Sequence, residues 1–340
     1  MAPAKVPTRQ LGSDGHQIPA IGIGLMGMSI GYGQAASDKD RLALLDRAWE
    51  IGCTNWDTSD IYGDSEDVIG KWFKLHPERR KDIFVASKFG LKATESGIVA
   101  DSSPEYCREC IDRSLTRLGV DQIDLYYIHR VDPAIPIEKT MEVMAELVQQ
   151  GKIKYVGLSE ISSATLRRAA AIHPIAAVQA EYSLSTTDIE GPKGTNLLDT
   201  CRELGVTIFA YSPLGRGILT GQLRAAADVS EPGDHRAGMH RFQGENLQKN
   251  LEVVDKIEQI AKKKGRTPGQ LALAWLGAQG PDIIPIPGTK RIKYLEENFE
   301  AVTVELSEEE LASLKKLIKE VEISGERDTA FGAYLDTAPL

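Results

Sequence analysis

The sequence has no long apolar run, no excess of positive charge and only four cysteines among its 340 residues. No stretch approaches the roughly 18 apolar residues that a membrane-spanning helix requires, and residues 1–10 lack the apolar segment typical of a secretory signal. Acidic residues number 49 against 40 basic ones, and the formal net charge of −9 argues against a surface for nucleic acid. We therefore expect a cytoplasmic protein with neither membrane nor nucleic-acid partners.

Metal ligands are also scarce. Cys107 and Cys110 form the only C-x-x-C pair, and no second pair completes a structural zinc site. The pair lies in a segment with a helical pattern, so we favour helix packing over metal binding. Six histidines are present, but only His129 stands at the end of an expected strand. A metal-dependent hydrolase therefore lacks ligands, and we expect no metal.

The usual dinucleotide signature is missing in its full context. The stretch Gly22-Ile23-Gly24-Leu25-Met26-Gly27 lacks a partner acid at the expected distance, so we reject it as a Rossmann motif. A nicotinamide cofactor, if one binds, must be held in another way.

What the sequence does contain is a regular alternation of short β-rich runs and helical segments from about Ile18 onward. This order predicts parallel strands joined by crossover helices. Eight such units predict an α/β fold, a (β/α)8 TIM barrel, as a single domain over residues 1–340. The expected strands are residues 20–24, 53–57, 83–87, 123–128, 153–158, 176–181, 207–211 and 282–286.

Three additions to the barrel are expected. An N-terminal β-hairpin over Arg9 to Ile18, with Asp14-Gly15 in its turn, would plug the barrel bottom. About seventy residues separate strands seven and eight, and they include helices at 246–263 and 268–278. The Gly/Pro/His-rich part of this region, Asp228 to Gln243, is expected to be a mobile lid. A C-terminal extra helix begins at the capping box Ser307-Glu308-Glu309-Glu310.

Four polar residues are expected to meet at the mouth of this barrel. Asp57, Lys88 and His129 each end a short apolar run, and Tyr62 follows the first of these runs. Taken singly, each is most often a solvated loop residue or half of an ion pair. Taken together, they fit the addition of hydride to a carbonyl, which needs a proton for the oxygen, and barrel active sites lie at this face.

We assign a different role to each of the four. Tyr62 is the acid, Lys88 adjusts its pKa, Asp57 orients Lys88, and His129 polarises the carbonyl. One positive charge at about 4 Å and an effective dielectric near 20 is worth about 4 kcal/mol, or roughly three pKa units. An uncompensated Lys88 would bring the pKa of Tyr62 close to neutrality, and Asp57 would offset part of that shift.

The same mouth offers places for a cofactor. The turn Ile286-Pro287-Gly288-Thr289-Lys290-Arg291 leads from strand eight into a helix over 293–301 and suits a phosphate, although a basic turn at a helix start is the alternative. Tyr211 could stack on a flat ring or pack on the barrel lip. Ser159 and Gln179 point to the same end and could hold a carboxamide.

These residues together resemble the aldo-keto reductase superfamily. The match runs in order from about residue 8 to residue 323. It rests on seven motifs: 55–63 (NWDTSDIYG), 87–90 (SKFG), 128–130 (IHR), 157–160 (GLSE), 178–183 (VQAEYS), 210–217 (AYSPLGRG) and 286–291 (IPGTKR). The chain looks most like the microbial, fungal and plant NADP-dependent branch that includes pyridoxal reductases.

The resemblance implies NADPH bound across the mouth, without metal or flavin, and a catalytic tetrad of Asp57, Tyr62, Lys88 and His129. By position, it also implies cofactor contacts for Leu25, Met26, Ser159, Gln179, Tyr211, Ser212, Leu214, Gly217, Gly288, Lys290, Arg291, Tyr294, Glu297 and Asn298. Two positions depart from the family pattern. Glu160 stands where many members have asparagine, and Lys290-Arg291 replaces a Lys-Ser pattern while keeping cations for a 2′-phosphate.

Two functions follow as hypotheses. The first is NADPH-dependent reduction of an aldehyde or ketone, with a small-molecule carbonyl as substrate and Met26, Met28, Tyr32 and Phe242 as candidate apolar walls of its pocket. The alternative is a cofactor-sensing regulatory subunit of the potassium-channel β-subunit type, which the intact tetrad argues against. Fold alone does not decide between them.

Overall fold

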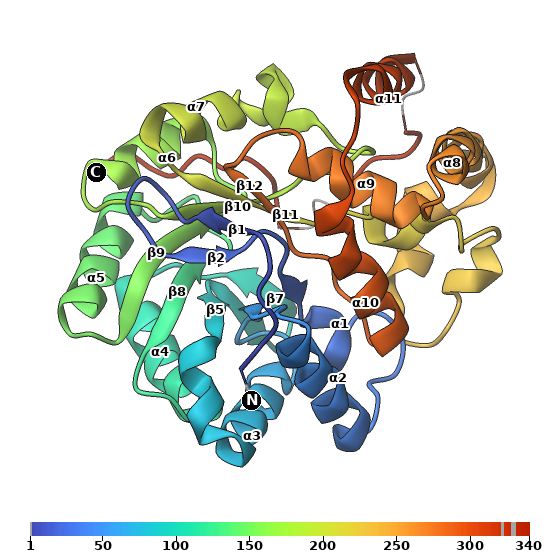
Figure 1. The fold of residues 1–340 in the computed structure, drawn as a ribbon. Helices are drawn as coiled ribbons and strands as arrows, with labels where there is room; N and C mark the ends of the chain where they lie inside the picture. Colours follow the sequence, from blue (N-terminus) through green and yellow to red (C-terminus); the bar gives the residue numbers. More distant parts are fainter. Residues whose placement is uncertain (1, 321–322, 328–330) are drawn as a thin grey trace.

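Eight parallel strands surround the centre of the computed structural model, which describes residues 2–320, 323–327 and 331–340 (Figure 1). Each expected strand is present, and four of the eight are shorter than the sequence pattern suggested. They are β3 (Ile23–Gly24), β4 (Asn55–Asp57), β5 (Phe84–Phe89), β8 (Ile123–Ile128), β9 (Ile153–Ser159), β10 (Ala177–Glu181), β11 (Thr207–Tyr211) and β12 (Ile283–Pro285).

The sheet closes on itself. Neighbouring strands pair in parallel in the order β12-β11-β10-β9-β8-β5-β4-β3. At the seam, Gly22 N donates to Pro285 O (3.0 Å) and Gly24 N donates to Pro287 O (3.2 Å), and Gly24 bridges Gly288. The predicted TIM barrel is therefore confirmed.

Helices cover the outside of the barrel. Serine caps start three of them, because the side chains of Ser37, Ser103 and Ser162 accept hydrogen bonds from backbone N–H groups of the first turn. The barrel helices are α2 (Asp38–Glu50), α3 (Ser65–Leu75), α4 (Pro104–Leu118), α5 (Ile137–Gln149), α6 (Ser163–Ala170), α7 (Leu197–Leu204), α9 (Pro268–Gly277) and α10 (Ile292–Glu300). Within the described part of the chain, no helix is long and apolar enough to cross a membrane.

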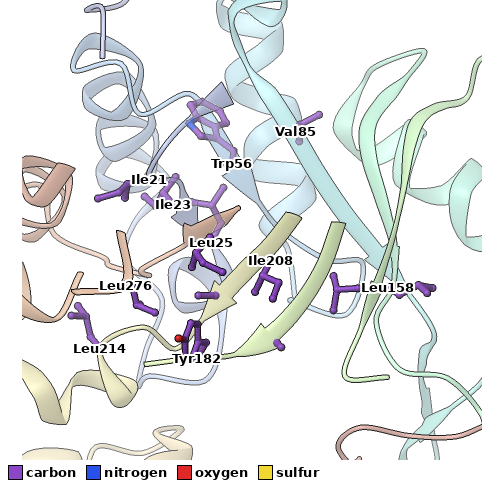
Figure 2. Close-up of a cluster of buried hydrophobic side chains, with 14 of the residues drawn as sticks. Ile21, Ile23, Leu25, Trp56, Val85, Leu158, Tyr182, Ile208, Leu214 and Leu276 are labelled. Carbon is purple, nitrogen blue, oxygen red and sulfur yellow. The ribbon is translucent and has the colours of Figure 1, made fainter. Parts of the chain in front are cut away.

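Alternate side chains of a strand point to opposite faces of the sheet, so they pack either in the outer core, between the strands and the helices, or in the inner core, inside the barrel. In β5, Val85 packs against the helices, whereas Phe84 and Ala86 join the cluster inside the barrel. Figure 2 shows part of the outer core, where Trp56, Ile208 and Leu158 contribute from three strands. Since side chains alternate along a strand, this parity decides which polar residues at the strand ends face the barrel axis.

The N-terminal hairpin occupies the bottom of the barrel, as expected. Strands β1 (Thr8–Gln10) and β2 (Gln17–Pro19) pair antiparallel across the Asp14-Gly15 turn. Leu11 and Ile18 are buried in the inner cluster with Phe84 and Phe209. The bottom is thus sealed by apolar contact, and access to the barrel is from the opposite end.

The region between β11 and β12 holds the predicted extra helix, α8 (Gly244–Lys263), ahead of α9. The C-terminal helix α11 (Glu308–Glu320) starts at the expected capping box, with Ser307 N donating to Glu310 Oε2 (2.8 Å) and Glu310 N to Ser307 Oγ (3.2 Å). Residues 228–243 are not structureless. They contain the end of the 3-10 helix η5 (Ala226–Val229) and the short 3-10 helices η6 (His235–Gly238) and η7 (His240–Phe242). Motion of this segment stays a prediction.

The sequence pattern did not reveal two features. A β-hairpin, β6 (Leu91–Thr94) with β7 (Gly97–Ala100), follows β5 at the mouth. The C-terminal segment returns to the barrel after α11, where Leu335 bridges Ile161 and Ala338 N donates to Pro133 O (2.8 Å).

Cys107 and Cys110 of α4 are buried in the hydrophobic core outside the barrel. Cys107 Sγ lies 3.7 Å from Met144 Sδ, so the helix-packing interpretation is confirmed.

Candidate active site

A cavity of about 650 Å³ opens at the carboxyl ends of the strands. Every residue that the sequence singled out for catalysis or cofactor contact lines this cavity except Lys88, whose side chain is fully buried behind Asp57 and Tyr62. The lining residues among them are Leu25, Met26, Asp57, Tyr62, His129, Ser159, Gln179, Tyr211, Ser212, Leu214, Gly217, Gly288, Lys290, Arg291, Tyr294, Glu297 and Asn298.

Strand parity explains why the polar residues converge. In β5, Lys88 shares the parity of Phe84 and Ala86, which face inward. In β8, His129 shares the parity of the inward-facing Leu125 and Tyr127. The parallel register places these strand ends at one level, since Asp57 pairs with Ala86 and Lys88 pairs with Tyr127.

Lys88 is held by a buried set of acceptors. Its Nζ lies 2.5 Å from Asp57 Oδ1 and donates to Thr58 O at 2.8 Å. Gln179 Nε2 donates to the other carboxylate oxygen, Asp57 Oδ2, at 2.8 Å. Both oxygens of Asp57 are therefore engaged, which fixes the ammonium of Lys88 beneath the ring of Tyr62, 5.0 Å from its centroid.

Tyr62 and His129 face each other across the cavity end. The Tyr62 hydroxyl lies 3.4 Å from His129 Nε2, and Ser59 Oγ lies 3.1 Å from His129 Nδ1. If the serine hydroxyl donates to Nδ1, the proton of a neutral imidazole is on Nε2. In this tautomer, the Tyr62 O–H and the His129 Nε2–H are two hydrogen-bond donors at the same end of the cavity.

Burial dominates the pKa of Tyr62. Burial raises this pKa above its ordinary value, while the ammonium of Lys88 acts to lower it and the carboxylate of Asp57 acts to raise it. The sequence predicted a Tyr62 pKa close to neutrality only for an uncompensated Lys88, with Asp57 offsetting part of the shift; here the pKa is instead raised, because desolvation of the phenolate outweighs the nearby positive charge. Tyr62 holds its proton at neutral pH, as a proton donor must.

Lys88 and His129 also have shifted pKa values. Burial acts to lower the pKa of Lys88, but the Asp57 carboxylate and Tyr62 more than compensate and raise it, so the ammonium is retained. Burial, with Arg130 and Lys88 adding to it, holds the pKa of His129 well below its usual value. At neutral pH the site contains a cationic lysine and a neutral imidazole.

Ser159, Gln179 and Tyr211 form the next part of the cavity wall. Ser159 and Gln179 are direct partners in neighbouring strands, and Arg130 Nη1 donates to Ser159 Oγ at 3.2 Å. Tyr211 ends β11 beside Glu181 of β10. The hydroxyl of Ser159, the amide of Gln179 and the ring of Tyr211 thus line one cavity, which fits a flat heterocycle bearing an amide.

The loop after β11 is tightly curled. Ser212 (φ 48°), Arg216 (φ 58°) and Gly217 (φ 99°) all have left-handed backbone conformations. Arg236 Nη1 donates to Arg216 O (3.0 Å), so a second guanidinium stands beside this loop. Successive right- and left-handed residues form concave groups of N–H donors that bind anions, and a pyrophosphate fits such a loop.

Two cations mark the far end of the cavity. Lys290 reaches across it and donates to Tyr32 O (2.5 Å) and Gln34 O (3.1 Å), which leaves one of its three N–H donors for an anion. Arg291 caps α10 and its guanidinium carbon lies 5.7 Å from the ring centroid of Tyr294. A Cβ atom added to Gly288 would lie 3.1 Å from Gly24 O. The backbone of these two glycines therefore lines the cavity between its catalytic end and its cationic end.

The candidate substrate walls are partly wrong. Met26 and Tyr32 line the cavity, whereas Met28 and Phe242 are buried in the outer core. The short helix α1 (Met26–Ser29) turns Met28 away from the mouth, and Phe242 packs beneath η7.

Sequence reasoning also missed several residues of the cavity wall. Arg130 directly follows His129 and was within reach of the sequence argument. Ile61 and Leu91 stand close in sequence to Tyr62 and Lys88 and were also within reach, whereas Ile30, Ile98 and Phe331 carry no local signal, because the segments that bring them to the mouth lie farther along the chain from the four polar residues.

Comparisons with known proteins agree with this geometry. The family model described as the aldo/keto reductase family matches residues 20–319. The aldo-keto reductase str7 of Strobilurus tenacellus is 52% identical over 339 residues, covering 98% of both chains. The aldo-keto reductase yakc [NADP(+)] of Schizosaccharomyces pombe is 47% identical over 342 residues, covering 98% of this chain and 99% of that protein.

Solved structures give the same result. A glycerol dehydrogenase from Gluconobacter oxydans has a TM-score of 0.82 at 26% identity, covering 95% of this chain and 98% of its own. A thermostable aldo-keto reductase in complex with the inhibitor epalrestat has a TM-score of 0.71 at 32% identity, covering 92% and 100%. From its sequence, its barrel and its full-length relatives, this chain belongs to the aldo/keto reductase family.

Proposed function

We propose that the protein reduces an aldehyde or ketone to the alcohol with NADPH. The observation that carries this proposal is the shared cavity: the Tyr62 hydroxyl and His129 Nε2 lie 3.4 Å apart at one end, and Lys290 and Arg291 stand at the other. One end supplies a proton donor and a hydrogen-bond donor for a carbonyl oxygen, and the other supplies cations for phosphate.

The residues of this chain divide the work. When bound, NADPH supplies the hydride that the carbonyl carbon receives. Tyr62 gives its proton to the carbonyl oxygen, and His129 donates a hydrogen bond that fixes this oxygen and stabilises its developing negative charge. Lys88 stabilises the phenolate that Tyr62 becomes, and Asp57 together with Gln179 keeps Lys88 in place.

The cofactor preference follows from charge. A 2′-phosphate distinguishes NADP from NAD and needs cationic partners, which Lys290 and Arg291 offer. Ser159 and Gln179 would hold the carboxamide, Tyr211 would stack on the nicotinamide, and the curled loop would receive the pyrophosphate. The name of the fission-yeast relative, which carries NADP(+), supports this choice. Membership of the branch with pyridoxal reductases is part of the proposal.

The substrate is proposed to be a small carbonyl compound with an apolar body. Ile30, Ile61, Leu91 and Ile98 line the cavity around Tyr62 and His129, so an apolar group beside the carbonyl would be covered. The cytoplasm is the proposed location. Cys107 and Cys110 are free thiols although they stand one helical turn apart, which suits a reducing compartment.

The test is a fluorescence titration with NADPH and with NADH, followed by addition of 4-nitrobenzaldehyde and recording of the nicotinamide absorbance. Tighter binding of NADPH and consumption on adding the aldehyde are expected. Tight binding without consumption of this or other aldehydes would overturn the reductase and favour a cofactor-sensing subunit instead.

A further inference from the structure

Four charged side chains form a buried cluster beside the nicotinamide end of the cavity. Glu160, Glu181, Arg241 and Arg327 have side-chain exposures of 0%, 2%, 15% and 6%. Arg327 Nη2 donates to Glu160 Oε2 at 2.6 Å, and Arg241 Nη1 donates to Glu181 Oε1 at 3.3 Å. Two carboxylates thus face two guanidiniums, and the cluster is neutral as a whole.

The cluster joins segments that are far apart in sequence. Glu160 follows β9 and Glu181 ends β10, so both are fixed to the barrel. Arg327 belongs to the C-terminal segment, and Arg241 lies in η7, where its Nε also donates to Gly325 O at 3.1 Å. The charges therefore fasten both the C-terminal segment and residues 240–242 to the strand ends.

Glu160 has an unusual backbone. Its φ is 55°, a left-handed conformation that disfavours a glutamate and suits asparagine or glycine better. Glu160 Oε1 accepts from Glu181 N (3.1 Å), its Oε2 accepts from Arg327 Nη2, and its backbone O accepts from Leu335 N (2.9 Å). Such strain persists only where surrounding contacts hold it, and here these contacts include the ion pair.

The cluster reaches the cavity by two routes. Arg327 Nη2 lies 3.4 Å from the Tyr211 hydroxyl, and Tyr211 lines the cavity. Arg327 Nη1 also donates to Tyr334 Oη at 2.6 Å, and Phe331 and Gly332, which precede Tyr334, line the cavity. A displaced guanidinium would loosen both the aromatic ring and this wall.

We propose that Glu160 and Arg327 are positioning residues, whose buried ion pair seats the C-terminal segment as a wall of the carbonyl site and holds Tyr211 in place. This inference rests on the proposed reductase function for its kinetic consequences, but not for its structural ones. Lys290 and Arg291 lie at the other end of the cavity, so NADPH affinity depends mainly on contacts that the pair does not touch.

The experiment uses the full-length variant Arg327→Met, which keeps most of the side-chain stem and removes the charge. We expect the KM for 4-nitrobenzaldehyde to rise about tenfold while the Kd for NADPH changes less than about threefold. Hydrogen exchange of residues 331–340 should become faster in the same variant. Arg327→Lys, which keeps the charge without the forked geometry, should rescue part of both effects.

Arg80→Met is the matched control. Arg80 pairs with Asp124 at 2.9 Å and donates to Ile83 O and Gln122 O, at the amino ends of the strands. It should lower the melting temperature without altering the aldehyde KM or the exchange of residues 331–340. An Arg327→Met protein with the KM and the exchange of the unmodified enzyme would overturn the proposal.

A buried carboxylate without its partner is costly, so Arg327→Met is paired with the double variant Glu160→Gln/Arg327→Met, which leaves no unpaired charge at these two positions. If only the double variant folds, its aldehyde KM and the hydrogen exchange of its residues 331–340 are compared with those of the unmodified protein, and unchanged values would again overturn the proposal. Failure of the reductase proposal is separable, because the unmodified protein would then not consume NADPH, while the exchange comparison would still test the ion pair.

Discussion

At the scale of single residues, the proposed reaction depends on one hydroxyl, that of Tyr62. Tyr62→Phe removes the only atom that can protonate the substrate from this ring, and general acid catalysis is worth about 10²- to 10⁴-fold. We therefore expect kcat for aldehyde reduction to fall by about that factor, with the Kd for NADPH unchanged. Steady-state kinetics and fluorescence titration measure the two quantities.

Tyr155→Phe is the matched control for that substitution. The Tyr155 hydroxyl lies 3.0 Å from His16 Nδ1 at the bottom of the barrel, away from the cavity, so its loss should leave kcat unchanged. Normal turnover by Tyr62→Phe would remove Tyr62 as the acid and leave the hydroxyl–imidazole pair unexplained.

His129 should make stability depend on pH. Its pKa in the folded protein is well below 6.5, so at pH 5 the unfolded chain binds a proton that the folded chain excludes. Stability from this residue is complete above the unfolded pKa and is lost as pH falls below it, by about 2 kcal/mol at pH 5. Urea unfolding of the protein and of His129→Gln at pH 7 and pH 5 measures this loss. The substitution should flatten the difference between the two pH values, and an equal pH dependence in both proteins would contradict a neutral buried imidazole.

At the scale of elements, we propose that the start of α10 determines the preference for NADPH over NADH. Lys290→Ala/Arg291→Ala removes two cations, and a hydrogen bond to a charged group is worth about 1.5–3 kcal/mol. We expect NADPH to bind roughly 10- to 100-fold more weakly, with NADH nearly unaffected, in parallel fluorescence titrations. Equal weakening of both cofactors would mean that these residues act by holding the loop at Tyr32 and Gln34 rather than the 2′-phosphate.

The elements were readable from sequence where a local rule governs them. The ends of the apolar runs placed Asp57, Lys88 and His129 at one mouth, and the capping box Ser307-Glu308-Glu309-Glu310 marked the start of α11. Effects that depend on three-dimensional surroundings were not readable. Burial reversed the expected direction of the Tyr62 pKa, and α1 turned Met28 into the core. Glu160 was noticed as a departure, but its partner Arg327 is 167 residues away and no local pattern links them.

At the scale of the whole molecule, the barrel separates stability from chemistry. Leu11 is fully buried in the inner cluster at the bottom, and the cavity lies at the opposite end. Leu11→Ala should therefore lower the free energy of unfolding by about 2–5 kcal/mol and leave the aldehyde KM and the NADPH Kd unchanged. Leu75→Ala, at a side chain that is 61% exposed, should alter stability by less than about 0.5 kcal/mol. Urea unfolding with and without NADPH tests further whether the bottom of the barrel is independent of the cofactor site. NADPH at 100 times its Kd should add about 2.7 kcal/mol to the free energy of unfolding of the unmodified protein and of Leu11→Ala alike. A smaller increment for Leu11→Ala would show that the plug at the bottom shapes the cofactor site at the mouth.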